Sequence, residues 1–335
     1  MNSFGRLFRV TIFGESHGES VGITIDGCPA GVPLPLEEFL PDLERRKGGV
    51  QKGTTPRKED DLPIFKSGLF QGVSTGAPIT ILFENNNTRS TDYEKQRAVP
   101  RPGHADFVAH KKFGGFEDYR GGGAFSARLT VGLVAAGVIA KKLMGQEIRV
   151  KADILEIGGE RDLERGLQRA IDAKDSIGGI VECRVSGLPI GLGEPFFDSV
   201  ESLLAHAAFA IPAVRGVEFG TGFAAARMFG SQHNDAIEDM TGRTRTNHAG
   251  GVVGGLTNGN ELVYRIAIKP TSSTPREQLT LNWETEQQEA FSVKGRHDLC
   301  VALRAPVILE AMTAIVLADL LLLEQRIPRI WSLKY

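Results

Sequence analysis

The sequence has few cysteines, and their placement excludes both a disulfide framework and a cysteine-ligated metal site. The 335 residues include Cys28, Cys183 and Cys300, an odd number without the close pairs that hold zinc. Such usage is typical of reduced thiols, so a cytoplasmic protein is expected. None of the seven histidines belongs to an HxxxH or HExxH pair, and no metal is expected.

The chain also has almost no net charge. The chain has 39 basic and 41 acidic residues, so no overall field attracts nucleic acid or a membrane surface. An anionic ligand must therefore be bound by a local cluster of cations. The N-terminus contains no apolar run of signal-peptide length. The most apolar segment, 306–323, carries Glu310 and Asp319, which predicts a buried helix rather than a membrane span.

Glycine, by contrast, is abundant, and several glycine-containing patterns occur twice. The chain has 40 glycines, many beside polar residues, which suggests that backbone approaches a ligand. Three patterns recur in the same order: 26–32 and 186–192, 72–79 and 255–262, 128–135 and 304–311. This spacing is too long for a solenoid. We expect one domain over 1–335, built from two similar halves of about 1–150 and 151–335.

Each half predicts the same succession of elements. Helix candidates follow β-type runs: 36–46 follows 22–25, and 200–209 follows 180–185. Asp198 with Glu201 three residues later predicts a capping box at the second of these helices. The predicted fold is therefore α+β. It is a duplicated β–α sandwich with central antiparallel sheets, helices outside and internal pseudo-twofold symmetry.

Three glycine-bounded loops carry side chains that handle protons. GESHG (14–18) presses a glutamate, Ser16 and His17 together, and RPGHAD (101–106) sets His104 beside an arginine and an aspartate. GRHD (295–298) repeats the order of base, histidine and acid. Histidine is the side chain poised to exchange protons near neutral pH. The alternatives are a polar turn for the first loop and a turn histidine bonded to its own aspartate for the second.

Other loops suit a small anion. A basic cluster over 45–58 interleaves arginines and lysines with glycines and threonines; guanidinium groups suit carboxylates and phosphates, although a solvated loop is the alternative. The glycine run in 119–128 opens a helix, where N–H groups bind anions. KPTSS (269–273) suits a cofactor phosphate, or is a proline-containing edge turn. The GxGxxA match at 220–225 lacks a βαβ unit and is weak. Together these loops suit proton-assisted loss or transfer of a phosphate.

Seven motifs, taken together and in order, resemble those of the chorismate synthase family. They are GESHG (14–18), RPGHAD (101–106), DYRGGG…SAR (118–128), GVEFG (216–220), NHAGGVVGG–TNG (247–259), KPTSS (269–273) and GRHD (295–298). The resemblance implies conversion of 5-enolpyruvylshikimate 3-phosphate to chorismate by trans-1,4-elimination of phosphate, a step of the shikimate pathway to the aromatic amino acids. It also implies reduced FMN without net redox change, and a homotetramer.

The resemblance implies roles for four residues. His17 would act as general acid on the leaving phosphate, and Ser16 would lie close to the flavin. His104 would donate a proton to the reduced flavin near N1. Asp298 would face flavin N5 and accept its proton, after the flavin has lent electron density to the departure of phosphate.

Binding residues follow from the same motifs. The resemblance implies substrate contacts at Arg46, Lys52 and Arg128. It implies FMN contacts at Ala124, Phe125, Ser126, Ile211, Pro212, Ala213, Gly254, Lys269, Pro270, Thr271, Ser272, Ser273 and Arg296.

The sequence departs from the family pattern in the glycine loop and the basic cluster. Ala124, Phe125 and Leu129 stand where arginine, serine and glutamate are common, and Lys47 and Lys52 stand where arginine is common. The lost guanidinium weakens the case for anion contacts at position 124. A phenylalanine at 125 would instead stack on the flavin.

Two alternatives to this function remain. One is a diverged FMN-dependent phosphate lyase whose substrate changed along with the glycine loop. The other is a non-catalytic flavin-binding protein, although binding alone does not need His17, His104 and Asp298. No reductase segment is appended, so we expect an external supply of reduced flavin rather than reduction by NADPH. The polar, asparagine-rich stretch 86–100 predicts a loop that becomes ordered when ligand binds.

Overall fold

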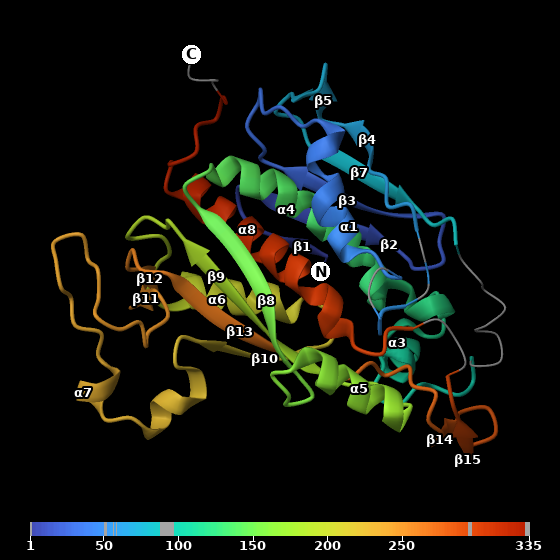
Figure 1. Cartoon of the computed structure of the whole chain (residues 1–335). Coiled ribbons are helices and arrows are strands. Elements are labelled where there is room, and N and C mark those ends of the chain that lie inside the picture. Colours follow the sequence, from blue (N-terminus) through green and yellow to red (C-terminus); the bar gives the residue numbers. More distant parts are fainter. Residues whose placement is uncertain are drawn as a thin grey trace.

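The computed structural model describes residues 2–49, 52–55, 57, 59–87, 97–293 and 297–331. Two antiparallel sheets form its framework (Figure 1). The first sheet has the strand order β1 (Ser3–Phe4), β2 (Arg9–Gly14), β3 (Ser20–Asp26), β7 (Ile79–Glu84), β4 (Ile64–Ser67). The second has the order β10 (Val214–Phe219), β13 (Leu262–Ile268), β9 (Gly179–Ser186), β8 (Arg149–Ile157). Three short hairpins complete the described strands: β5 (Leu69–Phe70) with β6 (Val73–Ser74), β11 (Val252–Val253) with β12 (Leu256–Thr257), and β14 (Gln278–Asn282) with β15 (Gln287–Phe291).

The strands form where apolar residues alternate along the chain. In β7, Ile79, Ile81 and Phe83 are buried while the residues between them are not, as expected for a strand with one face on the core. The same strand pairs with β3 on one side and β4 on the other. Its last residue, Glu84, leads directly into the loop region that carries the candidate site.

The α-helices are α1 (Leu40–Arg46), α3 (Asp106–Phe113), α4 (Thr130–Met144), α5 (Leu163–Ala173), α6 (Val200–Phe209), α7 (Gly230–His233) and α8 (Ala305–Leu323). Short 3₁₀ segments lie at 36–38, 120–125, 127–129, 196–198, 222–227 and 301–304. The helix predicted over 200–209 is α6. The one predicted over 36–46 is divided into a 3₁₀ turn and α1. The cap of α6 is Ser199, whose hydroxyl accepts from the N–H of Ser202, rather than the predicted Asp198.

Two long helices form the core of the molecule. The helix α4 packs on β3 and β7, α8 packs on β8 and β9, and the two helices pack against each other (Figure 1). The α+β class with antiparallel sheets is confirmed. The layer order differs from the expected one, since α4 and α8 lie between the two sheets rather than outside them. Both helices are apolar on nearly all sides and almost entirely buried, which only an inner layer allows.

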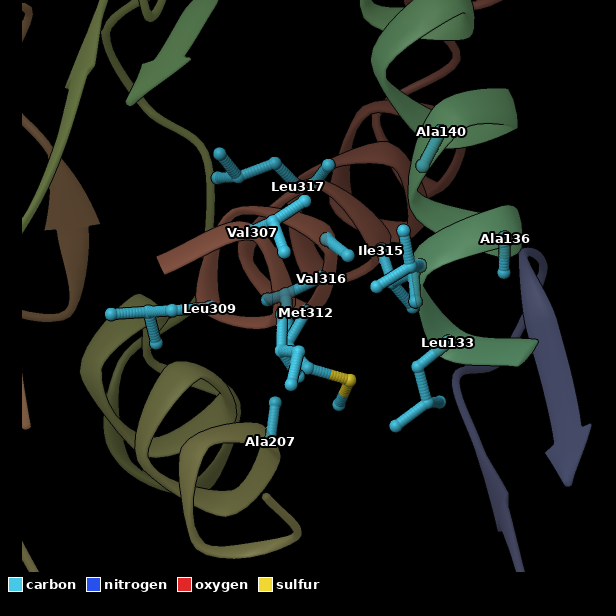
Figure 2. Close-up of a cluster of buried hydrophobic side chains, with 14 of the residues drawn as sticks. Leu133, Ala136, Ala140, Ala207, Val307, Leu309, Met312, Ile315, Val316 and Leu317 are labelled. Carbon is cyan, nitrogen blue, oxygen red and sulfur yellow. The ribbon is translucent and has the colours of Figure 1, made fainter. Parts of the chain in front are cut away.

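Small residues let the central helices approach closely. A Cβ on Gly137 of α4 would lie 2.3 Å from the Cβ of Ala311 in α8, so a larger residue has no room there. Side chains of α4, α6 and α8, including Leu133, Ala207 and Met312, gather into one apolar cluster (Figure 2). By length and composition α8 could cross a membrane, but most of its apolar window is buried inside the protein.

The two carboxylates of α8 are buried because each has a full set of donors. Glu310 accepts hydrogen bonds from Arg45 at 2.7 and 2.8 Å and from Lys141 at 2.9 Å. Asp319 accepts from three successive backbone N–H groups, of residues 6–8. Burial alone would raise the pKa of Glu310, but the bonds from Arg45 and Lys141 outweigh it and hold that pKa below its usual value.

The internal repeat extends to single hydrogen bonds. Across the sheets, the spatial order β2, β3, β7, β4 of the first corresponds to the order β8, β9, β13, β10 of the second. The N–H of Val32 donates to the hydroxyl of Ser74 at 2.9 Å, and the N–H of Leu192 donates to the hydroxyl of Thr257 at 2.9 Å. Each hydroxyl also donates to the carbonyl of the proline three residues before that N–H, Pro29 at 2.5 Å and Pro189 at 2.7 Å. Loops from both halves meet near the first turns of α4 and α8, and the candidate site lies there.

Candidate active site

A cavity of about 400 Å³ lies where these loops meet. This volume is within the range of small-molecule sites. Most of the residues singled out from the sequence line it: Ser16, His17, Arg46, His104, Phe125, Ser126, Arg128, Pro212, Ala213, Lys269, Pro270, Thr271, Ser272, Ser273 and Asp298. Residues far apart in the chain thus share one site.

Five of the expected contacts are placed elsewhere or are not described. Lys52 is exposed, and its ammonium donates to Gln168 at 3.2 Å. Ala124 and Ile211 line a neighbouring hollow, which shares Phe125, Ser126 and Lys269 with the cavity. Gly254 lies in the turn between β11 and β12. Arg296 lies outside the described residues, as do positions 88–96 of the predicted loop.

His17 sits in a tight turn that follows β2. Gly14 ends that strand with φ of +100°, which a residue with a side chain rarely adopts. Ser16 and His17 are then 1% and 8% exposed, and the N–H of Ser16 donates to the carbonyl of Gly123 at 3.1 Å. Burial lowers the pKa of His17, and the charges of Arg57 and Arg120 lower it further. The free protein therefore keeps this ring mostly neutral near pH 7.

The three consecutive glycines explain how two histidines share one wall. A Cβ on Gly121 would lie 2.3 Å from the His17 ring, and one on Gly122 would lie 3.1 Å from the His104 ring. Both glycines have positive φ, as does Gly123. The loop therefore fits between the two rings only because these positions have no side chain.

His104 is held by the other residues of its motif. Its Nδ1 lies 2.5 Å from Oδ1 of Asp106 and 3.0 Å from the guanidinium of Arg101. Arg101 also donates to both carboxylate oxygens of Asp106, at 2.7 and 2.8 Å. Burial would raise the pKa of Asp106, but the bonds from Arg101 and His104 outweigh it and place that pKa far below its usual value. The carboxylate stays ionised and orients the imidazole.

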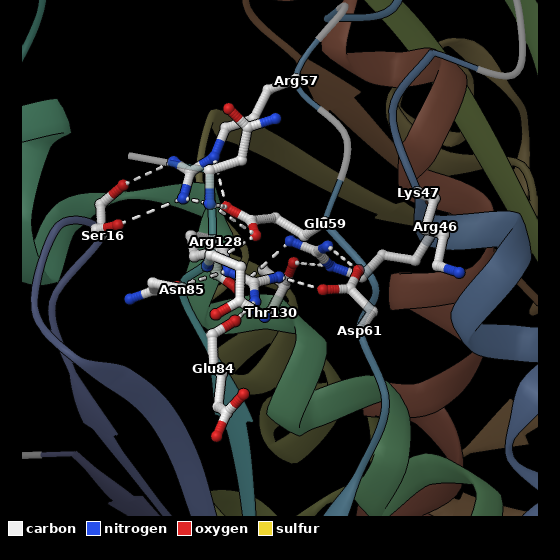
Figure 3. Close-up of polar contacts among 12 residues, drawn as sticks. Ser16, Arg46, Lys47, Arg57, Glu59, Asp61, Glu84, Asn85, Arg128 and Thr130 are labelled. Atoms are coloured by element: carbon white, nitrogen blue, oxygen red, sulfur yellow. Dashed lines mark hydrogen bonds and ion pairs between the residues drawn. The ribbon is translucent and has the colours of Figure 1, made fainter. Parts of the chain in front are cut away.

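Two buried arginines share one buried aspartate beside the cavity (Figure 3). Arg46 donates to Asp61 at 3.1 Å and to the hydroxyl of Thr130 at 3.1 Å, and Arg128 is paired with the other carboxylate oxygen of Asp61. Burial would raise the pKa of Asp61, but the two guanidinium groups outweigh it and lower that pKa. The cluster keeps one excess positive charge in fixed geometry.

Asp298 is anchored from two directions. Its Oδ1 accepts from the N–H of Thr55 at 2.8 Å, and its Oδ2 accepts from Arg304 at 3.0 Å. Arg304 also donates to the carbonyl of Arg46 at 2.7 Å. The neighbouring His297 lines the same cavity, and burial lowers its pKa. The acid and the histidine of the GRHD motif therefore both face this site.

All five residues of the KPTSS segment (269–273) line the cavity. The ammonium of Lys269 donates to Ser272 at 2.7 Å and to the carbonyl of Gly103 at 2.9 Å, so this segment is tied to the RPGHAD loop. Burial lowers the pKa of Lys269, and Arg215 lowers it further. The hydroxyl of Thr271 is buried and has no hydrogen-bond partner among the described residues. An uncompensated buried hydroxyl indicates a place for a polar ligand atom.

The described lining of the cavity is strongly basic. Seven arginines and lysines line it, against three carboxylates, an excess of four positive charges. Such an excess within a recessed site attracts and holds an anion. This local excess of positive charge is not visible in the composition of the whole chain, which has a net charge of −2.

Several functional candidates were missed from the sequence. Glu59 and Asp61 follow the basic cluster directly, and this change of charge sign was the available signal for their pairing. Arg57 lies in that cluster, and its guanidinium donates to the hydroxyl of Ser16 at 3.2 Å and to Glu59 at 2.6 Å. Arg304 opens the pattern 304–311 as Arg128 opens 128–135, and this correspondence was the available signal for it.

Comparisons with known proteins assign the chain to a family. A family model described as chorismate synthase matches residues 8–322. A chorismate synthase from Chitinophaga pinensis is 72% identical, with 99% of this chain and 100% of the relative covered. One from Dehalococcoides mccartyi is 45% identical, with 98% and 99% covered. A crystal structure of chorismate synthase superimposes with a TM-score of 0.73 at 27% identity, covering 96% of this chain and 93% of the other. The matched length and the identity together mean that the chain belongs to the chorismate synthase family.

Proposed function

We propose that the cavity binds 5-enolpyruvylshikimate 3-phosphate and eliminates its phosphate in a trans-1,4 sense to give chorismate. The activity of a lyase that removes phosphate follows from the family. The observation that carries the proposal for this cavity is the placement of buried His17 among an excess of four positive charges. This is the combination required by a substrate with two carboxylates and a phosphate, and by the departing phosphate.

The arginines have separate tasks in this proposal. Arg46 uses four of its five N–H groups on protein partners, since it donates to Asp61, Thr130 and two carbonyls. It supplies fixed positive charge. Arg128 and Arg57 lie at the cavity surface and supply both charge and direction to the substrate anions. Lys52 lies outside the cavity and reaches the substrate only if its contact with Gln168 breaks.

His17 is proposed as the general acid. Its pKa is lowered in the free protein, so it would have to gain a proton when the substrate arrives. A phosphate dianion beside the ring favours the imidazolium and raises its pKa. The protonated ring then delivers its proton to the phosphate oxygen as the carbon–oxygen bond breaks. Ser16, fixed by Arg57, keeps the ring at the phosphate.

The residues present fit FMN. The phosphate would bind at Lys269, Thr271, Ser272 and Ser273, where the hydroxyl of Thr271 has no partner among the described residues. Phe125, Pro212 and Ala213 offer apolar surface to the ring system. When bound in reduced form, FMN supplies electron density that assists loss of phosphate and is recovered afterwards, without net redox change. His104, oriented by Asp106, and Asp298, held by Arg304, are the groups proposed to hold or move protons beside it.

Self-association is proposed as well, in the form of a homotetramer. Large apolar side chains are exposed in the loops of the second half. Phe196, Phe197, Phe223 and Phe229 are 85%, 92%, 79% and 78% exposed, far more than isolated surface residues of a monomer would account for. Phe229 directly precedes α7, which lies apart from the sheets in Figure 1, and Phe223 lies in the 3₁₀ segment before it. Sedimentation at micromolar concentration tests this, and a monomer would remove the proposal.

The proposed setting is the cytoplasm, with an external supply of reduced flavin. All three cysteines are free and buried, and burial raises their pKa values, to about 11 for Cys28 and Cys300 and about 12 for Cys183. Such thiols are compatible with a reducing compartment. NADPH alone, in place of dithionite, should then fail to support activity.

The deciding experiment is an anaerobic assay. The purified protein is mixed with FMN reduced by dithionite and with 5-enolpyruvylshikimate 3-phosphate, and chorismate is followed by its absorbance. Formation of chorismate with many turnovers per FMN is expected. Stoichiometric oxidation of FMN would contradict catalysis without net redox change.

A further inference from the structure

Asn85 is the residue that follows β7, and its side chain joins two parts of the site. Its Oδ1 accepts from Nε of Arg128 at 2.9 Å. Its Nδ2 donates to the carbonyl of Glu15 at 3.0 Å and to the carbonyl of Gly18 at 2.9 Å. Figure 3 shows the amide beside Arg128 and Ser16. One side chain thus contacts the buried arginine cluster and both ends of the turn that carries His17.

An amide is the side chain that matches these partners. A carbonyl oxygen must face a cation, and a group with two N–H donors must face two carbonyls. Aspartate has no proton for the carbonyls of Glu15 and Gly18. A leucine would leave all three partners of Asn85 without their bonds. The amide oxygen of Asn85 therefore suits Arg128, and its NH₂ group suits the two carbonyls of the turn.

The cluster that Asn85 contacts is rigid. Arg128 is 6% exposed and is paired with Asp61, which also binds Arg46. Its Nη2 donates to the carbonyl of Glu84 at 3.1 Å. The backbone N–H of Asn85 donates to the carbonyl of Glu19 at 3.1 Å. The amide is therefore held at a fixed place relative to the cations of the cavity.

The turn itself needs such a support. Ser16 is held separately, through the carbonyl of Gly123 and the guanidinium of Arg57. Only the bonds from Asn85 fix the carbonyls of Glu15 and Gly18 to another element in the described part of the chain. These two carbonyls bracket His17.

We propose that Asn85 is a positioning residue that keeps the proton donor His17 in register with the anion-binding Arg128. The proposal rests on the role of His17 as general acid given above. Through one amide, the site sets the distance between the group that holds the substrate anion and the group that protonates the leaving phosphate. A shift of about 1 Å between such groups is enough to cost about 10²-fold in rate.

The test compares N85D with N85S and with N86D as the matched control. N85D keeps an oxygen for Arg128 but loses both donors to the turn, so kcat should fall about 10- to 100-fold while KM stays within about twofold. N85S releases Arg128 as well, so kcat should fall and KM should rise. Asn86 is exposed and uses its backbone N–H to bind Glu59. N86D adds the same charge one residue away and should keep wild-type kinetics.

A spectroscopic readout separates positioning from general damage. The ring resonances of His17 are assigned by comparison with H17A and titrated in each folded variant. We expect the His17 signals to shift and its pKa to rise in N85D and N85S, and to stay unchanged in N86D. Wild-type kcat and an unchanged His17 signal in N85D would overturn the proposal. If H17A itself keeps wild-type kcat, the general-acid role fails instead, and the His17 signal in N85D still reports whether Asn85 holds the turn.

Discussion

Replacing Gly121 with alanine should displace the His17 ring and slow catalysis. A Cβ at this position would lie 2.3 Å from both Cε1 and Nδ1 of His17 and 2.9 Å from the hydroxyl of Ser16. Non-bonded carbon atoms need about 3.5 Å, so the ring must move by about 1 Å. A displacement of this size at a reacting group costs about 10²-fold. We expect kcat of G121A to fall about 100-fold in the anaerobic assay with reduced FMN, measured by chorismate absorbance.

The steric effect must be separated from backbone strain. Gly121 has φ of +60°, and an alanine in the left-handed region costs about 1–2 kcal/mol by itself. Gly72 is the matched control, because its φ is +78° and no described atom lies within 4 Å of its Cβ position. G72A should lose a similar amount of stability but keep its kcat. Denaturant unfolding of both variants measures that loss.

Gly122 provides a graded comparison. Its Cβ would lie 3.1 and 3.2 Å from two atoms of the His104 ring, so the ring needs to yield by only a few tenths of an ångström. The expected order of kcat is G121A below G122A, and G122A below G72A. Equal kcat for G121A and G72A would refute the idea that the missing side chain at Gly121 sets the position of His17.

Three further outcomes are expected. H17A should lose about 10²–10⁴-fold in rate and be rescued by a substrate whose leaving group needs no proton, whereas H104A should stay slow; equal rescue of both would mean that the two roles are misassigned. Substrate binding at pH 7 should take up a proton, because the pKa of His17 lies below its usual value in the free protein and rises beside a phosphate dianion. Calorimetry in two buffers of different ionisation enthalpy measures this uptake, and its persistence in H17N would assign it to another group. D61N should lose about 3–5 kcal/mol of stability in denaturant unfolding, because Arg46 and Arg128 would stay buried without their counter-ion; a loss below 1 kcal/mol would show that the two charges are solvated.

Local sequence predicted much of the secondary structure and many of the residues that line the site. The strand predicted over 180–185 lies within β9 and the helix over 200–209 is α6, because apolar periodicity and strand or helix length are local properties. The motifs with histidines also marked His17, His104 and Asp298, which line one cavity. Proton-handling residues between glycines can be recognised in any sequence, because the residue type alone determines the chemistry of its side chain.

The capping residue and the layer order needed the folded chain. Ser199 rather than Asp198 caps α6, because the exact residue at which a helix begins depends on where the preceding segment can turn. The helices α4 and α8 lie between the sheets because their small residues, such as Gly137 against Ala311, let them pack against each other. An all-round apolar helix must be covered on every side, but composition alone does not say which elements cover it.

The internal geometry of the site was decided by tertiary structure alone. The sequence marks Gly121 as part of a glycine loop. A side chain is excluded at this position because a Cβ would collide with the ring of His17, more than one hundred residues earlier in the chain. Asn85 and Asp61 carry no motif, yet they join Arg128 to the turn of His17 and to Arg46. Such roles depend on distances between segments that only folding brings together. Local sequence determines which chemistry a residue can perform, and packing determines which partner it performs it with.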